Sequence, residues 1–322
     1  MQFNEKESSW QSRNEFKFGP RFASPVNSPS YEWRDDTQFL QVTRGCSHNA
    51  CRYCTFFKNV PYGKVDLDEV AFYLRFIANG DKDMPVKRIF LQGSNAMHLS
   101  YDELMEISEL IYTYLPNLES IGSYGRIDDL RDKSVEQLNA LKDAGYDRLF
   151  FGVESADDNL LALMSKGYDS AELYEAGGKL RESALQWACT IMFGMGGHGY
   201  GFGHAEKSAD FINFAQPDIT GAVSMTLIFD PYTKMYAPLK YAVDRGEFTE
   251  AGEIERYEEM RAFVERVNAS TIFAAKHSTF PQGFRAILPD EKEELIAAIS
   301  KTIEEGDEDM FRSLRTWVPK AM

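Results

Sequence analysis

The stretch QVTRGCSHNACRYCTFF, residues 41–57, carries three of the chain's four cysteines. They are Cys46, Cys51 and Cys54, spaced C-x4-C-x2-C, and His48 lies in the wider gap. Three thiols on one short segment are typical of a metal site, because thiolates are soft ligands for zinc and iron–sulfur clusters. The apolar run directly before Cys46 predicts a strand that delivers this segment to one edge of a sheet.

Short apolar runs alternate with amphipathic segments along residues 38–228. The runs predict strands at 38–43, 87–93, 119–123, 147–153, 187–194 and 220–227. Periodicity and capping residues predict helices at 66–78, 101–114, 134–143, 157–165 and 170–184. Such alternation implies a parallel sheet with right-handed crossovers. We therefore expect an α/β fold, a partial (β/α)6 TIM-like barrel, with chemistry at the C-terminal ends of its strands.

Two further segments flank the expected barrel. Residues 1–37 form an N-terminal arm whose aromatic side chains are expected to pack on the main body. Residues 229–322 form a C-terminal α/β extension that closes the barrel, and its acidic helix is expected to present a solvated face. In this extension the pattern predicts helices at 251–267 and 290–305 and a strand at 270–277.

Composition narrows the class of protein. The net charge of −15 comes from 50 acidic and 35 basic residues, which disfavours a nucleic-acid partner because such binding needs clustered Lys and Arg. No apolar run approaches the roughly 18 residues that a membrane span requires. The charged N-terminus lacks an apolar signal core. We therefore expect a cytoplasmic protein that needs no membrane.

The cysteine segment itself allows two kinds of metal site. A 4Fe–4S cluster normally takes four cysteine ligands, so three cysteines leave one iron open to a substrate or cosubstrate. A structural zinc site could instead use the three cysteines and His48. Structural zinc ligands usually come as two separated pairs, and Cys46 and His48 stand only two residues apart. The alternative to an enzyme is thus a zinc-stabilised, non-catalytic binding protein.

The motif CSHNACRYC (46–54), at the end of a strand and followed by five strand–helix units, resembles the radical S-adenosylmethionine (radical SAM) superfamily. Most members have three residues between the first two cysteines, and this chain has four. The core is similar to that of coproporphyrinogen dehydrogenase and elongator proteins. The resemblance implies that Cys46, Cys51 and Cys54 hold a 4Fe–4S cluster and that SAM binds its open iron.

The resemblance further implies the reaction and the partners. Reductive cleavage of SAM would give a 5′-deoxyadenosyl radical that abstracts hydrogen from a small-molecule substrate. The electron would come from a flavodoxin- or ferredoxin-type donor. Within the superfamily, a tetrapyrrole- or tRNA-modifying enzyme is the alternative.

SAM contacts are implied at several strand ends. Tyr53 is expected near the adenine, and Lys166 stands where coproporphyrinogen-dehydrogenase-like members carry an arginine to the methionyl carboxylate. The chain reads QGSNA where most members have a Gly-Gly-Glu-like motif, so Gly93 matches the motif and Ser94 and Asn95 replace its second Gly and its acid. The other implied contacts are Gly93, Ser94, Asn95, Ser123, Glu154 (in FFGVES), Ile191, Phe193 and Gly194 (in CTIMFGMGG).

Two residues are candidates on the substrate side. Arg126 could pair with a substrate carboxylate, or form a salt bridge with Asp128 or Asp129. His277 could donate a proton, bind substrate or serve as a structural histidine. The Gly-rich segment 194–204 is expected to be a mobile flap or a flexible connection.

Overall fold

The computed structural model describes residues 36–58, 60–80, 86–227, 229–230 and 235–315. The expected arm therefore lies outside the described residues, except for its last two positions. Within these ranges, no helix combines the length and the apolar character needed to cross a bilayer.

Eight strands form one sheet in the order β1-β4-β5-β6-β7-β8-β11-β12. Neighbours from β1 to β11 are parallel, and β12 pairs antiparallel with β11. The strands are β1 (Thr37–Gln41), β4 (Arg88–Gln92), β5 (Ser120–Arg126), β6 (Leu149–Glu154), β7 (Trp187–Phe193), β8 (Ile219–Ser224), β11 (Thr271–Ala275) and β12 (Phe284–Leu288). The six expected strands are adjacent and parallel, which confirms the predicted α/β partial barrel.

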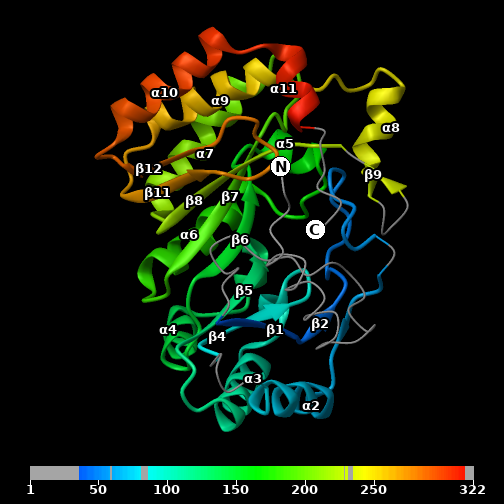
Figure 1. Cartoon of the computed structure of the whole chain (residues 1–322), viewed down its shortest axis with the longest axis vertical. Coiled ribbons are helices and arrows are strands. Elements are labelled where there is room, and N and C mark those ends of the chain that lie inside the picture. The colour runs from blue at the N-terminus through cyan, green and yellow to red at the C-terminus, as the bar shows by residue number, and fades with distance from the viewer. Residues whose placement is uncertain (1–35, 59, 81–85, 228, 231–234, 316–322) are drawn as a thin grey trace.

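Helices lie along the outer side of this curved sheet (Figure 1). The α-helices of the described residues are α2 (Leu67–Ala78), α3 (Tyr101–Tyr114), α4 (Val135–Asp143), α5 (Asp158–Leu163), α6 (Ser170–Glu182), α7 (Gly201–Ala215), α8 (Pro238–Asp244), α9 (Glu253–Arg266), α10 (Lys292–Glu305) and α11 (Glu308–Arg315). Side chains cap predicted helices: Ser100 and Ser134 each accept the backbone N–H of N3 in a capping box, and Asp157 accepts the N–H of Asn159. The sequence pattern does not predict α7, α8, α11 or β12.

The prediction of a flap at 194–204 is wrong for its last four residues. Gly201 begins α7, and His204 is fully buried. Two glycines in the first turn hide this helix from the pattern, because glycine is a poor helix former. Buried Phe211 and Ile212 hold α7 in place by burial of apolar surface, worth about 1.5–3 kcal/mol per large side chain.

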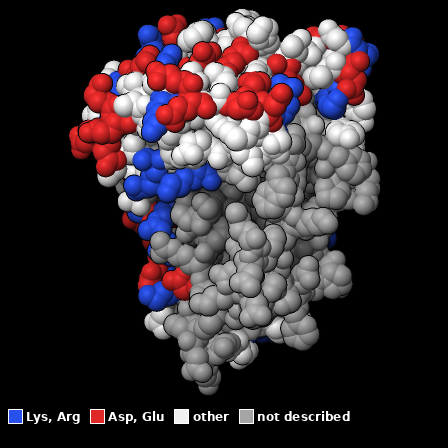
Figure 2. All heavy atoms as spheres, turned by 45° about the horizontal axis from the view of Figure 1, so that its top comes forward, with Lys and Arg blue, Asp and Glu red and all other residues white. Residues whose placement is uncertain are grey.

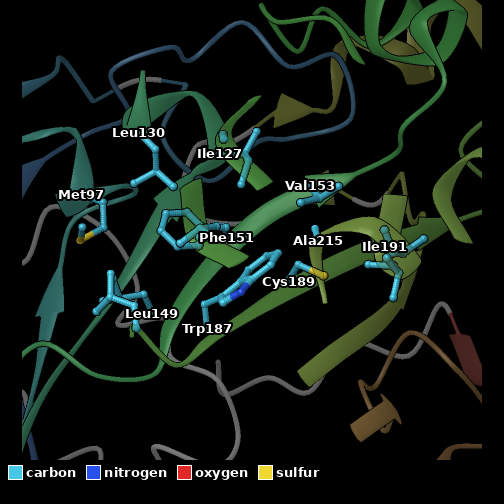
Figure 3. Packing of buried hydrophobic residues seen from close by; sticks show 14 of the residues in the cluster. Met97, Ile127, Leu130, Leu149, Phe151, Val153, Trp187, Cys189, Ile191 and Ala215 are labelled. Atoms are coloured by element: carbon cyan, nitrogen blue, oxygen red, sulfur yellow. The ribbon is translucent and has the colours of Figure 1, made fainter. Parts of the chain in front are cut away.

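Strand alternation separates two environments. Side chains of β6 and β7 that point to the helices meet Leu130 and Ala215 in a closely packed cluster (Figure 3). Those labelled are Leu149, Phe151, Val153, Trp187, Cys189 and Ile191. Cys189 is fully buried there, as expected for a core residue. The intervening residues face the barrel interior, because successive strand residues point to opposite faces.

Helices α9, α10 and α11 lie at the β8–β11–β12 end of the sheet (Figure 1). Leu295 and Ile299 of α10 are buried, while its acidic residues are exposed. Figure 2 shows Asp and Glu side chains gathered over the end of the molecule that α9, α10 and α11 form. The acidic helix therefore presents a solvated face, as the sequence predicts.

Candidate active site

The cysteine segment leaves the sheet at the C-terminal end of β1. The strand pair β2 (Thr43–Arg44) and β3 (Gly63–Lys64) encloses it as an antiparallel ribbon. Gly93, directly after β4, has φ +126°, and a Cβ there would lie 1.9 Å from Oγ1 of Thr43. Ser94 donates its N–H to the carbonyl of Gly45 at 3.2 Å. The β4 turn thus supports the cysteine segment at close range, and only glycine fits at position 93.

Asn95 fastens the start of the segment. Its Nδ2 donates to Oγ of Ser47 at 2.8 Å, and its Oδ1 accepts the N–H of Ser47 at 3.3 Å. Nδ2 also lies 3.0 Å from both carboxylate oxygens of Asp129. The amide of Asn95 is engaged in these contacts and its side chain is buried, so Asn95 holds the cysteine segment in place. From the sequence, Asn95 is expected to contact SAM.

His48 fastens the middle of the segment to the turn after α5. Its Nε2 donates to the carbonyl of Ser165 at 2.6 Å. Its ring lies so close to Gly167, where φ is +84°, that a Cβ there would be 2.5 Å from Cε1. Gly167, two residues after the helix expected at 157–165, therefore makes room for this ring.

Arg52 extends the connection. Its N–H donates to the carbonyl of Met164 at 3.0 Å, and its Nη1 to that of Leu163 at 3.0 Å. Its own carbonyl accepts the N–H of Leu239, in α8, at 2.8 Å. The cysteine segment is therefore held by residues from the middle and the last third of the chain.

The three thiols of this segment are free, and Cys51 is the most buried of them. Burial raises the pKa of Cys51, but a hydrogen bond with His48 and the positive charges of Lys166 and Arg126 outweigh it and lower the pKa to about 7. The site thus favours a thiolate, the form that binds metal.

Cys54 stands in a different environment. Burial is the main cause that raises its pKa to about 12, and the negative charges of Cys51 and Cys46 add to it. The three sulfurs are near enough to influence one another electrostatically. A bound cation or a metal cluster would relieve this repulsion, because a coordinated thiol is deprotonated outright.

Arg126 ends β5 beside Cys51. Its Nε and Nη2 lie 3.0 Å from the two carboxylate oxygens of Asp128, and Nη2 also donates to the carbonyl of Lys166. Its Nη1 donates to Sγ of Cys51 at 3.8 Å, and the guanidinium lies 5.6 Å from the ring centroid of Tyr168. The structure thus shows the salt bridge that the sequence analysis offered as the alternative to substrate binding.

Lys166 brings two other expected SAM contacts together. Its Nζ donates to the hydroxyl of Tyr53 at 3.2 Å and to the carbonyl of Gly152 at 3.1 Å, and lies 3.7 Å from Oε1 of Glu154. Burial lowers the pKa of this ammonium, but the acidic groups around it, Tyr168 and Glu154 first among them, hold its pKa above the ordinary value. A buried, charged lysine therefore faces the barrel interior next to Cys51.

Glu154 owes its direction to an irregularity in β6. The pairing of β6 with β7 shifts register between Gly152 and Glu154, and Glu154 has φ +66°. Bulges of this kind re-aim side chains near active sites, and a left-handed φ at a non-glycine residue stores strain. The carboxylate accepts a hydrogen bond from Oγ1 of Thr190 at 3.0 Å.

Three residues expected to contact SAM have side chains that face the helices and not the barrel interior. Ser123 is fully buried, and its Oγ donates to the carbonyl of Tyr124. It shares the strand face of Gly125, whose Cβ would meet Phe151 on the helix side, so its side chain does not face the interior. Ile191 and Phe193 also belong to the helix-facing core. These two can reach a ligand only through their backbone.

Glu259 and His204 form a buried pair that holds the C-terminal end of β7, and the sequence pattern does not predict it. Oε2 of Glu259, in α9, accepts the N–H of Gly194 at 2.7 Å, and Oε1 contacts Nδ1 of His204. Nε2 of His204 lies 3.2 Å from the carbonyl of Glu154. No local pattern in α9 marks Glu259 for this role, since its partners His204 and Gly194 lie 55 and 65 positions away in the sequence.

His277 lies two residues after β11, at the same end of the sheet as the cysteine segment. Its Nδ1 contacts Oγ1 of Thr279 at 3.0 Å, and Thr279 accepts the N–H of Ser224, the last residue of β8. His277 is exposed. The structure thus places it at the β8–β11 end of the barrel mouth.

Comparison with known families decides the identity of this scaffold. A model of the radical SAM superfamily matches residues 40–212, which is more than half of the chain. The chain belongs to the radical SAM superfamily. Members of this superfamily use a 4Fe–4S cluster and SAM.

One curated protein is similar to this radical SAM protein over about half of the chain. The heme chaperone HemW of Bacillus subtilis (strain 168) is 27% identical over 162 residues, which are 47% of this chain and 41% of HemW. The chain thus matches less than half the length of that relative. The solved structures that share the fold at low identity include the following two.

One of these structures is Elp3 of the archaeon Methanocaldococcus infernus, with 15% identity, a TM-score of 0.50, and coverage of 84% of this chain and 63% of Elp3. The other is the radical SAM methyltransferase TsrM of Kitasatospora setae, with 19% identity and a TM-score of 0.51. The match covers 70% of this chain and 42% of TsrM. At such identities the likeness shows the fold alone.

The donor set fits the iron–sulfur cluster of the superfamily. Within the described ranges, no three His, Cys, Asp or Glu side chains converge as a group that could hold one metal ion. That geometry gives no support to a preformed Cys3His zinc site. A cluster instead binds its cysteines at separate irons. Buried Arg126 and Lys166 beside Cys51 offset the negative charge that thiolate ligation brings.

Proposed function

We propose that this protein is a radical SAM enzyme in which Cys46, Cys51 and Cys54 hold the 4Fe–4S cluster. The observation that carries the proposal is the meeting of this cysteine segment with two buried cations, Arg126 and Lys166, at the C-terminal edge of the barrel. When bound, the cluster and SAM supply a 5′-deoxyadenosyl radical that takes a hydrogen atom from substrate. The protein supplies orientation, charge and exclusion of water.

SAM binding falls in this proposal to residues that surround Lys166. The ammonium of Lys166 donates to two neutral oxygens, the hydroxyl of Tyr53 and the carbonyl of Gly152, and its ion pair with Glu154 is longer, at 3.7 Å, so it can also bind the methionyl carboxylate of SAM. The Glu154 carboxylate, held by Thr190, can accept from the SAM amino group or ribose. Tyr53 offers its ring to the adenine. Gly93, Ser94 and Gly194 contribute backbone groups at the neighbouring strand ends.

The substrate side of the proposal rests on position. His277 stands exposed at the β8–β11 end of the mouth, where it can donate a proton to a small-molecule substrate or bind it.

We assign the barrel to residues 38–228 and its closing extension to 229–322. The electron comes from a flavodoxin- or ferredoxin-type donor in the cytoplasm.

Anaerobic reconstitution with iron and sulfide tests the proposal. We expect a brown protein with about four irons per chain, a reducible EPR signal, and cleavage of SAM to methionine and 5′-deoxyadenosine when dithionite is added. A colourless protein that binds stoichiometric zinc and no iron would contradict the proposal and support the binding-protein alternative.

The chain contains a matched control for the cluster ligands. Replacing Cys46, Cys51 and Cys54 by alanine should abolish cluster binding. Cys189→Ala removes the fourth thiol, which is fully buried and far along the chain in β7, and should leave the iron content unchanged. The variants are compared by their iron content and by their absorbance at about 400 nm, where sulfur-to-iron charge transfer absorbs.

A second candidate function is the binding of a tetrapyrrole. The 27% identity to a heme chaperone favours it. Titration of the reconstituted full chain with hemin should then give a saturable Soret change at equimolar hemin, and His277→Ala tests the exposed histidine as its ligand. A linear, non-saturable response that matches free hemin would exclude this function and leave SAM cleavage as the activity to measure.

A further inference from the structure

Arg126 is oriented by its contacts on two sides. Asp128 binds the edge formed by Nε and Nη2 through both carboxylate oxygens. The remaining nitrogen, Nη1, donates to Sγ of Cys51. The side chain is buried, and the ring of Tyr168 lies against the guanidinium. These contacts leave the side chain in one orientation, with its positive charge toward the sulfur and its counter-ion on the opposite edge.

We propose that Arg126 sets the reduction potential of the cluster by donating an N–H to the sulfur of Cys51, with Asp128 limiting its effect. The proposal rests on the proposed function, because it needs a cluster on Cys51. It gives Arg126 a role through a metal ligand, in place of the substrate contact that the sequence analysis considered.

The physical reason lies in the charge of the reduced state. Reduction adds one electron to a cluster that thiolates already make negative, so nearby positive charge and N–H donors favour the reduced form. The effect is large here because Arg126 and Cys51 are both buried, and charges interact more strongly away from water. Asp128 acts in the opposite sense, since its carboxylate disfavours the added electron.

This opposition predicts shifts of opposite sign. Arg126→Gln removes the cation and leaves Asp128 uncompensated, so the cluster becomes harder to reduce. Asp128→Asn leaves the Arg126 cation uncompensated, so the cluster becomes easier to reduce. We expect the ratio of reduced to oxidised cluster at a fixed potential to change by about tenfold in each direction, which for a one-electron couple is about 59 mV.

The experiment is a redox titration of reconstituted full-length protein, followed by EPR, in the absence of SAM. Arg131→Gln is the matched control: it removes the same charge from an exposed arginine that pairs with Glu172, and should leave the midpoint unchanged. Iron content is measured for every variant, so that only loaded clusters are compared. The midpoint reports on Arg126 separately from turnover.

The outcomes separate the inference from the proposed function. A loaded Arg126→Gln cluster with an unchanged or higher midpoint overturns the inference while the enzyme assignment stands. Absence of any cluster in the wild-type protein overturns the proposed function itself. Where Arg126→Gln fails to fold or to load, Asp128→Asn decides: a higher midpoint supports the role of Arg126, and an unchanged or lower one overturns it.

Discussion

The amide of Asn95 and the carboxylate of Asp129 face each other in the interior, with Nδ2 at 3.0 Å from both oxygens. The same carboxylate accepts the backbone N–H of Arg126 at 2.7 Å and contacts Nδ1 of His98 at 3.0 Å. Asn95 in turn binds Ser47. One buried acid thus links the ends of β4 and β5 to the cysteine segment.

Asn95→Ala should loosen that segment. The change leaves the Asp129 carboxylate without its amide donor and removes both contacts to Ser47, which should cost about 1–3 kcal/mol of unfolding free energy. The reconstituted variant should also lose iron faster during gel filtration. Asn79→Ala, at an exposed helix end, serves as control and should change stability by at most about 0.5 kcal/mol. Equal iron retention in both variants would show that Asn95 does not support the loop.

Gly93→Ala should destabilise the protein strongly. The new Cβ would clash with Thr43, and φ +126° is unfavourable for alanine, so a loss of more than about 2 kcal/mol is expected. Gly203 lies in α7 with open space around it, and Gly203→Ala should gain about 0.5–1 kcal/mol. Urea unfolding compares the two alanines. A Gly93→Ala variant as stable as the wild type would contradict the close packing of β4 on the cysteine segment.

The His98–Asp129 contact should make stability depend on pH. The hydrogen bond to Asp129 raises the pKa of His98 above its ordinary 6.5. A raised folded-state pKa gives stability that is fully present below the unfolded value and lost as pH rises through the folded value. The wild type should therefore exceed His98→Gln in stability by more at about pH 5.5 than at about pH 8.5. A gap that is equal or wider at the alkaline pH would refute the pairing.

Glu259 and Glu265 lie on the same helix but should differ greatly in importance. Glu259 and His204 are both fully buried, and breaking such a pair from one side costs about 3–5 kcal/mol. Glu265 is half exposed, and its ion pair with Arg261, one helical turn earlier at 3.7 Å, contributes at most about 1 kcal/mol. Thermal or urea unfolding of Glu259→Ala and Glu265→Ala measures the difference. Similar losses in both variants would argue against the buried pair.

The sequence predicts the sheet well because its strands are buried runs bounded by caps and glycines. The range predicted for α3 agrees with the observed one, and β11 lies within its predicted range. The sequence does not predict α7, because two glycines in its first turn weaken the local helix signal, although burial of Phe211 favours the helix. Burial depends on partners distant in sequence, and local propensity does not record it.

For the site, the sequence identifies residues but not their partners. Tyr53, Glu154 and Lys166 are expected at the mouth and meet there. Ser123 is the last residue of the strand expected at 119–123, but β5 continues to Arg126, and its alternation turns the Ser123 side chain to the helices. His204 and Glu259 escape notice because their hydrogen bonds join segments far apart in the chain, which spacing along the sequence does not encode.

The anchoring of Arg52 has a consequence for biosynthesis. Its guanidinium donates to the carbonyl of Leu163, 111 residues later in the chain, and its own carbonyl accepts the N–H of Leu239. A chain that has left the ribosome only as far as β5 thus exposes three thiols before the groups that hold them exist, and domains fold as units during synthesis. We therefore expect a cluster on these cysteines to be fully held only after the last third of the chain has folded, and the exposed thiols to be open to oxidation until then.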